Sequence, residues 1–332
     1  MADRNRPARP KVIVTRRLPA AVEARMAELF DAQFNESDRP MDRAALADAM
    51  QQCDVLVPTV TDQIDAELIA GAAERMRMIA NFGNGVDHID VAAAHARRIV
   101  VTNTPGVLTE DTADLTMALI LSVPRRVGEG RELLREGKWT GWSPTHMLGH
   151  RVGGKRLGIV GMGRIGMAVA RRARAFGLSI AYHNRHQLPP QAEEEAGATF
   201  VPALDTLMET SDIVTVHCPL TAQTRGMIGA RQFALMGADA YFINTARGEI
   251  ADEDALIGAL EQGMIAGAGL DVFAHEPAVD PRLLALPNAV LLPHLGSATM
   301  EARDAAGDKV ITNIRIWVDG HSPRDRVLIE RS

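Results

Sequence analysis

The architecture of this chain is set by the stretch Gly161-Met162-Gly163-Arg164-Ile165-Gly166. Apolar residues 156–160 precede it as a predicted buried strand, and residues 167–173 follow it as a predicted helix. Three glycines in this order permit a tight turn, a close approach of a pyrophosphate to the backbone, and close packing of strand against helix. The helix N-terminus adds free N–H groups and a partial positive charge. The loop therefore predicts a dinucleotide site in which residues 161–166 contact the cofactor.

Around this loop the sequence predicts a doubly wound α/β domain. Short apolar runs indicate six strands, at residues 157–160, 179–182, 213–217, 240–244, 266–270 and 290–292. Helices fit between them, such as the amphipathic segment 255–262, whereas residues 193–199 are interpreted as a helix end followed by a turn. Alternation of strands and helices is typical of a parallel sheet covered on both faces.

A smaller α/β unit precedes this domain. Its β-branched runs alternate with helical segments, at residues 11–14, 22–29, 54–57, 78–80 and 99–101. A long helix is expected to begin near Leu108, where Thr109 and two acidic residues form a capping signal. A last helix, residues 300–317, is followed by too few residues for a third domain, so we expect it to return to the first unit.

The predicted fold class is therefore α/β, with two Rossmann-like or flavodoxin-like domains built on doubly wound parallel sheets. We predict a substrate-binding domain at residues 1–105 and 299–332, and a dinucleotide-binding Rossmann domain at residues 106–298. Because the chain would cross twice between them, we expect the active site in the cleft between the domains.

Composition narrows the classes of partner. The 332 residues carry a net charge of −6 with both signs interspersed, which argues against a nucleic-acid partner. The most apolar helical run, residues 117–123, is far too short for a membrane span, and the N-terminus has no apolar signal core. Two cysteines, Cys53 and Cys218, lie far apart in apolar runs and give neither disulfide nor metal-site spacing. We expect a cytoplasmic protein without a metal.

Three charged side chains directly follow predicted strands of the larger domain: Arg247, Glu276 and His294. The carboxyl ends of parallel strands face one ligand crevice, so we expect these groups to meet there. Arginine binds a carboxylate bidentately, histidine exchanges a proton near neutral pH, and glutamate orients a protonated imidazole. Each residue alone could be a surface, turn or structural group, but together they favour reduction of a 2-keto acid.

The whole chain resembles the D-isomer-specific 2-hydroxyacid dehydrogenase family. The resemblance rests on four motifs: the loop at 161–166, Asn244-Thr245-Ala246-Arg247-Gly248, Gly269-Leu270-Asp271-Val272-Phe273 with Glu276-Pro277, and Pro293-His294-Leu295-Gly296-Ser297-Ala298-Thr299. Residues 81–90 and 103–109 are most similar to the glyoxylate and hydroxypyruvate reductase branch. That branch reduces small 2-keto acids to D-2-hydroxy acids with a nicotinamide dinucleotide.

The resemblance also implies roles for individual residues. Arg247 would hold the substrate carboxylate and keto oxygen, His294 would be the acid/base, and Glu276 would pair with His294. Backbone N–H groups in the loop Phe82-Gly83-Asn84 would receive the carboxylate, as a glycine-rich loop can. The predicted cofactor contacts outside the glycine loop are Thr112, Asn184, Arg185, His186, Cys218, Pro219, Thr245, Ala246, Asp271 and Gly296. The resemblance further implies a homodimer joined through the cofactor domains. Residues 119–142 are the segment that we expect at such an interface.

The predicted strand 179–182 ends at the residues that select the cofactor. An NAD site usually has an acidic residue near this position, whereas here Asn184-Arg185-His186 can accept a 2′-phosphate. NADP(H) is therefore expected in preference to NAD(H), although asparagine can also bind a ribose hydroxyl.

Two alternatives stay open. A different D-2-hydroxy acid, D-lactate-like or phosphoglycerate-like, would fit the same motifs, whereas formate is disfavoured because formate dehydrogenases of this family carry glutamine where this chain has Glu276. A dinucleotide-sensing protein similar to the corepressors of this family would bind the cofactor without turnover.

Overall fold

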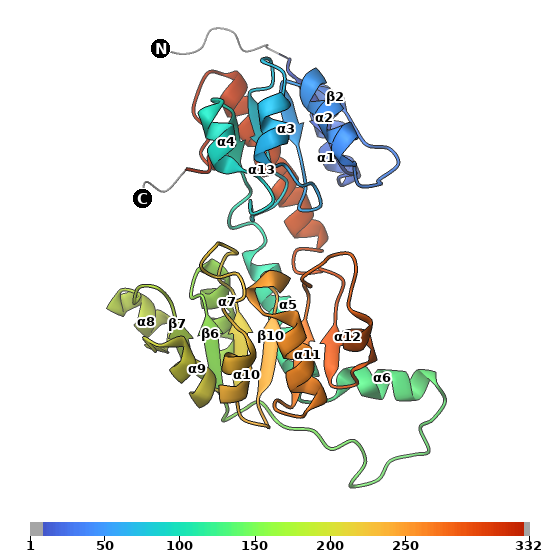
Figure 1. The fold of residues 1–332 in the computed structure, drawn as a ribbon, viewed down its shortest axis with the longest axis vertical. Helices are drawn as coiled ribbons and strands as arrows, with labels where there is room; N and C mark the ends of the chain where they lie inside the picture. The colour runs from blue at the N-terminus through green and yellow to red at the C-terminus, as the bar shows by residue number, and fades with distance from the viewer. Residues whose placement is uncertain (1–8, 329–332) are drawn as a thin grey trace. The chain divides into compact units, whose positions relative to one another are not determined.

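The computed structural model describes residues 9–328, and the chain divides into two compact units (Figure 1). We call Met1–Leu108 with Ala298–Ser332 the terminal unit and Thr109–Ser297 the central unit. Residues 1–8 and 329–332 of the predicted substrate domain lie outside the described range. Each unit has its own parallel sheet and its own hydrophobic core on each face of that sheet.

The terminal unit is built on five parallel strands. In spatial order they are β2 (Asp31–Gln33), β1 (Lys11–Val14), β3 (Val55–Val57), β4 (Met78–Ala80) and β5 (Val100–Thr102). The residues of β3 and β4 are all buried, because helices cover both faces of the sheet. From β1 the strand order runs outward in both directions, which creates a ligand crevice at the carboxyl ends of the strands in folds of this kind.

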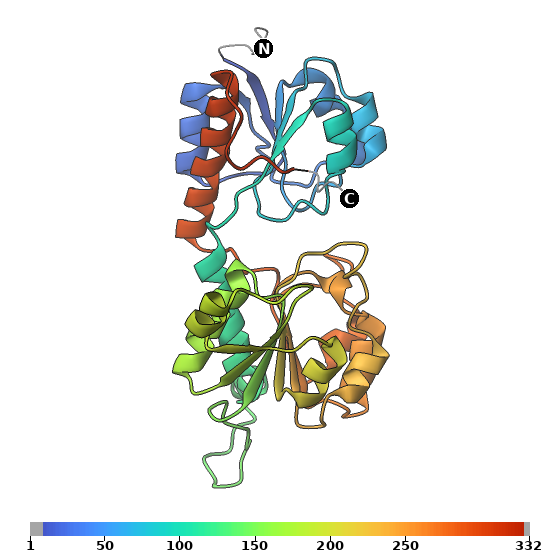
Figure 2. The ribbon, with the colours of Figure 1, turned by 90° about the vertical axis from the view of Figure 1, so that its left-hand side faces the viewer.

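Five α-helices cover this sheet: α1 (Ala20–Leu29), α2 (Arg43–Gln52), α3 (Ala66–Gly71), α4 (Val91–Ala96) and α13 (Met300–Val318). Helices α1 and α13 lie side by side on one face, where a Cβ on Gly307 would lie 2.3 Å from Val22 Cγ2 (Figure 2). This contact joins α13 to α1 within the terminal unit. An aspartate directly before each of α2, α3 and α4 accepts the N–H of the third helical residue and thereby fixes where the helix begins.

The central unit has a parallel sheet of seven strands. In spatial order they are β12 (Ala289–Leu291), β11 (Gly267–Leu270), β10 (Tyr241–Asn244), β9 (Ile213–Val216), β6 (Arg156–Val160), β7 (Ser179–His183) and β8 (Ala198–Phe200). The chain leaves β6 toward β7 and later returns through β9 on the other side of β6. The carboxyl end of β6, where the glycine loop begins, is therefore the point at which the strand order reverses.

Helices cover both faces of the central sheet. The helices of this unit are α5 (Thr109–Ser122), α6 (Val127–Arg135), α7 (Arg164–Ala175), α8 (Pro190–Ala196), α9 (Leu204–Thr210), α10 (Ala230–Leu235), the 3-10 helix η1 (Gly248–Ile250), α11 (Glu253–Glu261) and α12 (Pro281–Ala285), of which α6 buries no residue. Helices α5 and α7 pack on one face through small and apolar residues such as Ala113 and Ala168. Helices α9, α10 and α11 cover the other face through larger side chains such as Phe233.

The predicted fold class is confirmed, but two edge strands were missed. Residues 193–199 are not simply a helix end and a turn, because Gly197 ends α8 in a left-handed conformation and β8 begins at Ala198. The central sheet therefore has seven strands where the sequence indicated six. Strands β2 and β8 are three residues long and largely accessible on one side, so they carry no apolar run for a pattern to detect.

Candidate active site

The glycine loop connects β6 to α7, and two of its glycines are required by their neighbours. Gly161 has a φ of +99°, and a Cβ on it would lie 2.4 Å from the backbone nitrogen of Cys218. A Cβ on Gly166 would lie 2.4 Å from the carbonyl oxygen of Gly161. By contrast, a Cβ on Gly163 would meet nothing within 4 Å. Two glycines thus close the loop, and the third leaves its outer surface open to a ligand.

The N-terminus of α7 offers the groups that an anion needs. Gly163 is the N-cap, and no side chain caps the helix. Arg164 and Ile165 are the first helical residues, so their N–H groups have no partner within the helix. Free N–H groups and the partial positive charge of the helix end fit the pyrophosphate of a dinucleotide.

Asn184 ties the glycine loop to the end of β7. Its Oδ1 accepts a hydrogen bond from the backbone N–H of Met162 at 2.7 Å, beside the bond from the Gly161 N–H to the His183 carbonyl at 3.0 Å. Because Oδ1 is engaged, the amide group of Asn184 is the part of this side chain that can donate to a ligand. The neighbouring Arg185 is exposed, as is His186.

Tyr182, which is fully buried on β7, anchors the segment after Asn184. Its hydroxyl donates to Glu193 Oε1 at 2.6 Å and accepts from the Leu188 N–H at 2.8 Å. Gln187 Nε2 also donates to Glu193, at 3.0 Å. Burial and the Glu193 carboxylate raise the pKa of Tyr182 to about 12, so the phenol stays protonated. The loop that carries Arg185 is therefore held at both of its ends.

His294 and Glu276 form a hydrogen-bonded pair beyond the carboxyl ends of the central strands. Nδ1 of His294 lies 2.7 Å from Oε2 of Glu276, and about a third of each side chain is exposed, 30% and 33% respectively. Burial raises the pKa of Glu276, but the hydrogen bond and the charge of His294 outweigh it and hold this pKa below its usual range. An ionised carboxylate therefore orients the imidazole through Nδ1 and leaves Nε2 for proton exchange.

Arg247 follows β10 in a turn that Asn244 holds. Asn244 is buried, its Oδ1 accepts from the Ala246 N–H at 3.0 Å, and its Nδ2 donates to the Arg247 carbonyl at 2.8 Å. The Arg247 guanidinium donates to the Ala246 carbonyl at 2.8 Å. Its charge also contributes to the lowered pKa of Glu276, so Arg247 and His294 both act electrostatically on Glu276.

Asp271 shapes the turn that presents His294. The carboxylate is fully buried and accepts backbone N–H groups of residues 295 and 296 at 2.6 and 2.8 Å. Burial raises its pKa in spite of these two donors. The His294 N–H donates to the Asp271 carbonyl at 3.0 Å, and His294 has a left-handed φ of 55°. The Gly296 carbonyl in turn accepts from Thr112 Oγ1 at 2.9 Å. This network fixes a backbone conformation that histidine seldom adopts.

The end of β9 forms the opposite wall of the glycine loop. Cys218 is half-buried with its backbone against Gly161, and burial raises the pKa of its thiol to about 11. Pro219 is exposed. His217 lies next to them, 3.0 Å from Thr215 Oγ1, and burial lowers its pKa to about 3. His217 is therefore neutral near pH 7, in keeping with a structural role.

Three residues without a predicted role support the site. Thr116 Oγ1 lies 2.9 Å from the hydroxyl of Thr245, Asn244 holds the Arg247 turn, and Glu253 accepts the Ala274 N–H at 3.0 Å. Their partners lie on other elements or in tight turns, so only the folded chain shows the contacts.

The predicted substrate loop lies in the terminal unit, after β4. Phe82 is buried, whereas Gly83 is half-buried and Asn84 exposed. Asn81 Nδ2 donates to the carbonyls of Gly83 and Gly85 at 3.0 and 2.8 Å. The buried Asn81 thus binds carbonyl groups of this loop on the inner side. This arrangement favours N–H groups that point outward, where they can bind an anion.

All predicted catalytic and cofactor residues lie in the central unit, around the carboxyl ends of its strands and the N-terminus of α5. Within residues 9–328 no three histidine, cysteine, aspartate or glutamate side chains are grouped so that they could hold a metal ion. Over the same range, no helix combines the length and the apolar character needed to cross a membrane.

Comparison with known proteins places this site in context. The family described as D-isomer specific 2-hydroxyacid dehydrogenase, NAD binding domain, matches residues 117–296. A glyoxylate reductase from Thermococcus litoralis is 43% identical over 323 residues, 96% of this chain and 97% of that protein. The solved structure of an NADPH-dependent glyoxylate/hydroxypyruvate reductase from Sinorhizobium meliloti, in complex with NADP and malonate, is 37% identical with a TM-score of 0.86 and covers 98% of this chain and 99% of its own.

Proposed function

The chain belongs to the D-isomer-specific 2-hydroxyacid dehydrogenase family and is an oxidoreductase, and we propose that it reduces small 2-keto acids with a nicotinamide dinucleotide. The proposed substrates are glyoxylate and hydroxypyruvate, and the products are the corresponding 2-hydroxy acids, of D configuration where the carbon is chiral. The relatives named above carry these substrates in their names. The observation that carries the proposal is the His294–Glu276 pair, 2.7 Å apart and within the electrostatic reach of Arg247.

In the proposed mechanism, protonated His294 donates from Nε2 to the carbonyl oxygen of the substrate while Glu276 holds Nδ1. When bound, the reduced nicotinamide supplies the hydride that adds to C2. The Arg247 guanidinium binds the carboxylate and offsets the negative charge that develops on the oxygen. The backbone N–H groups of Gly83 and Asn84 are the proposed anion-binding groups of the terminal unit itself.

We further propose NADPH as the preferred cofactor. The glycine loop and the open N-terminus of α7 fit the pyrophosphate that both nicotinamide dinucleotides carry. At the adenosine end, Oδ1 of Asn184 already accepts the Met162 N–H, and the amide hydrogens on Nδ2 are left to donate to a ligand. A donor amide beside the exposed Arg185 suits a 2′-phosphate, which accepts hydrogen bonds and carries negative charge.

Arg185→Ala tests this choice. We expect the KM for NADPH to rise about tenfold because one charge-assisted contact is lost, with the KM for NADH unchanged. Arg231→Ala is the matched control, since Arg231 pairs with Asp205 on the surface of the same unit. A wild-type chain that prefers NADH, or a variant that loses both cofactors equally, would contradict the choice.

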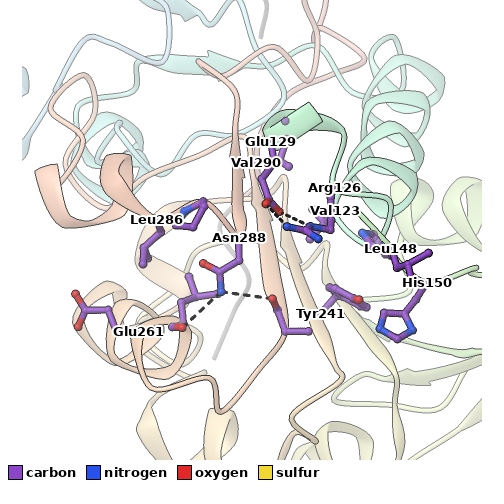
Figure 3. Close-up of a pocket in the computed structure, with 16 residues that line it drawn as sticks. Val123, Arg126, Glu129, Leu148, His150, Tyr241, Glu261, Leu286, Asn288 and Val290 are labelled. Carbon is purple, nitrogen blue, oxygen red and sulfur yellow. Dashed lines mark hydrogen bonds and ion pairs between the residues drawn. The ribbon is translucent and has the colours of Figure 1, made fainter. Parts of the chain in front are cut away.

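The proposed assembly is a homodimer joined through the central unit. Of the expected interface segment 119–142, the first residues such as Leu119 and Ile120 are buried in the core. Residues 127–142 and the adjoining loop up to 148 expose large apolar side chains: Val127, Leu134, Trp139, Trp142 and Leu148. Beside it lies a cavity of about 530 Å³ lined by residues such as Arg126, Leu148 and Tyr241 (Figure 3). Exposed apolar clusters of this kind favour burial against a partner.

This cavity is separate from the candidate active site. Tyr241 begins β10, and Asn288 directly precedes β12, so the cavity lies at the amino ends of the central strands. Light scattering should give the mass of two chains for the wild type and of one chain for a Leu134→Glu, Trp142→Glu variant. A monomeric wild type would contradict the homodimer.

We propose the cytoplasm as the compartment, because both cysteines are free thiols, Cys53 buried and Cys218 half-buried. Fractionation of the native cell with antibodies against the chain tests this, and recovery outside the cytoplasmic fraction would contradict it.

The reaction itself is tested by a steady-state panel. Purified protein is supplied with NADPH or NADH and with glyoxylate, hydroxypyruvate, pyruvate or 3-phosphohydroxypyruvate, and cofactor oxidation is followed by absorbance. We expect the highest kcat/KM with the first two acids. Cofactor binding without turnover on any of the acids would instead favour the dinucleotide sensor.

A further inference from the structure

We propose that Glu253 is a positioning residue of the active site. Its side chain holds the loop that carries Glu276 and thereby keeps the Glu276 carboxylate within hydrogen-bonding distance of His294. The inference rests on the proposed function in so far as His294 is the proton donor. It adds a residue that touches neither substrate nor cofactor and that acts through a backbone contact.

The contact joins two elements of the central unit. Glu253 is the first residue of α11 and is half-buried. Its Oε2 accepts the backbone N–H of Ala274 at 3.0 Å, across 21 positions of the sequence. Ala274 precedes Glu276 by two residues, so this bond fixes the backbone directly before the catalytic carboxylate.

The loop from Phe273 to Glu276 is held by two carboxylates on consecutive N–H groups. The Phe273 N–H donates to Glu276 Oε1 at 3.1 Å, and the Ala274 N–H donates to Glu253. Glu276 is thus bonded at one oxygen to its own loop and at the other to His294. Because the loop backbone sets where the first oxygen lies, a shift of this backbone also shifts the oxygen that faces the imidazole.

Glu253 ends a short segment that starts at Arg247 and packs against the Glu276 loop. A Cβ on Gly248 would lie 2.0 Å from the Phe273 carbonyl carbon, so the backbone of η1 packs directly against the Glu276 loop. Three residues after η1, Glu253 opens α11, whose cap Asp252 accepts the Ala255 N–H at 3.0 Å. The segment 247–253 therefore carries Arg247 at one end and binds the Glu276 loop through Glu253 at the other. This arrangement couples the position of Arg247 to that of Glu276.

The charged groups around the His294–Glu276 pair determine how loss of the Glu253–Ala274 hydrogen bond affects the protonation of His294. His294 and Glu276 are surrounded by the carboxylate of Asp271 at the end of β11 and by the guanidinium of Arg247 at the end of β10. Glu253 contributes a further carboxylate, placed favourably at the N-terminus of α11. Without its side chain, the Ala274 N–H loses its acceptor and the loop relaxes, which lengthens the Glu276–His294 bond. A weaker partner favours the protonated imidazole less, so the proton donor is lost at a lower pH.

Glu253→Ala should therefore change the pH dependence as well as the rate. We expect kcat/KM for keto-acid reduction to fall about tenfold through misplacement of the pair. The basic limb of its pH profile should move by about half a unit toward lower pH. Glu253→Gln keeps an oxygen that can accept the Ala274 N–H and should restore both values to near wild type. Glu253→Asp keeps the charge but withdraws the carboxylate by one methylene and should behave like the alanine variant.

The matched control is Asp254→Asn, which removes a charge from the same helical turn. Asp254 is 80% exposed and pairs with the exposed Arg282, and within residues 9–328 it makes no hydrogen bond to the backbone of residues 273–276. Its pH profile and kcat/KM should equal those of the wild type. Should Glu253→Ala fail to fold, Glu253→Asp tests the same contact.

A second readout separates this inference from the reductase proposal. The imidazole of His294 is followed by NMR without substrate and is assigned by comparison with His294→Gln. We expect its titration midpoint to fall in Glu253→Ala and Glu253→Asp but not in Asp254→Asn. Superimposable titrations and pH profiles, with only a lower melting temperature, would show a purely structural role and overturn the inference. An inactive wild type with shifted titrations would contradict the reductase and leave the positioning role standing.

Discussion

The loop at residues 82–85 in the terminal unit and the loop at 161–166 in the central unit both follow a buried parallel strand, but they are held in different ways. In the central loop the glycines are required by close neighbours, since a Cβ on Gly161 would lie 2.4 Å from a backbone nitrogen. In the terminal loop a Cβ on Gly83 would meet only Asn81 Nδ2, at an ordinary contact distance of 3.4 Å. The central loop is thus held by close packing in addition to its bond to Asn184, whereas the terminal loop is held by side-chain hydrogen bonds from Asn81 without such packing at Gly83.

The difference extends to the proposed division of labour. The central unit carries the proton donor, its carboxylate partner and the cofactor loop, whereas the terminal loop offers only backbone groups to a carboxylate. Substitutions in the central unit should therefore change the chemical step or the fold, and substitutions in the terminal loop should change substrate binding.

The largest effect is expected from removal of the proton donor. His294→Gln should lower kcat by about 10³-fold, because general acid catalysis is lost while the turn held by Asp271 remains. The comparison variant is His150→Gln, whose histidine lines the cavity at the amino ends of the strands. It should retain wild-type kcat in the same assay. A His294→Gln enzyme with kcat within a few-fold of wild type would place the chemical step elsewhere.

Paired alanine substitutions test how the two loops are held. Gly161→Ala should lower the free energy of unfolding by about 3 kcal/mol, through overlap with Cys218 and a left-handed φ. Gly83→Ala should change it by less than about 0.5 kcal/mol. Urea denaturation followed by circular dichroism measures both. Equal destabilisation of the two variants would remove the distinction between a packed and a hydrogen-bonded loop.

A smaller effect is expected from the terminal loop. Asn81→Ala removes the donors to the carbonyls of Gly83 and Gly85, so the loop should lose order. We expect the KM for glyoxylate to rise about tenfold, with kcat within about twofold of wild type. The reason is that the loop would bind the carboxylate equally well in the substrate complex and in the transition state. Steady-state kinetics at saturating NADPH separates the two constants. A fall in kcat at unchanged KM would assign the loop to the chemical step.

The smallest effect concerns stability in acid. The pKa of Glu276 lies below its ordinary value of 4.5, so ionised Glu276 stabilises the fold above that pH. This contribution disappears as pH falls through the lowered pKa. Glu276→Gln should therefore be less stable than wild type near pH 6, and the difference in unfolding free energy should shrink as pH falls from 4.5 through the lowered pKa. A difference in unfolding free energy that persists unchanged at pH 3 would show that the ion pair is not its source.

Much of this account is encoded in local sequence patterns. Strand β1 and the start of α7 follow directly from an apolar run and from a glycine loop, and the residues after β10, β11 and β12 carry the charged groups that the pattern placed at strand ends. Strands β2 and β8 escaped detection because an edge strand of three partly exposed residues has no periodicity of its own. Asn244, Glu253 and Asn81 could not be assigned because their partners are backbone groups, which any sequence offers at every position.

The proposed reaction is tested most directly by the fate of the hydride. NADPH labelled with deuterium at the transferred C4 position is incubated with glyoxylate and the purified chain, and the product is analysed by NMR and mass spectrometry. The account predicts glycolate with one deuterium at C2 from the wild type, and a rate about 10³-fold lower from His294→Gln. Unlabelled glycolate, or no glycolate with either nicotinamide dinucleotide, would contradict it.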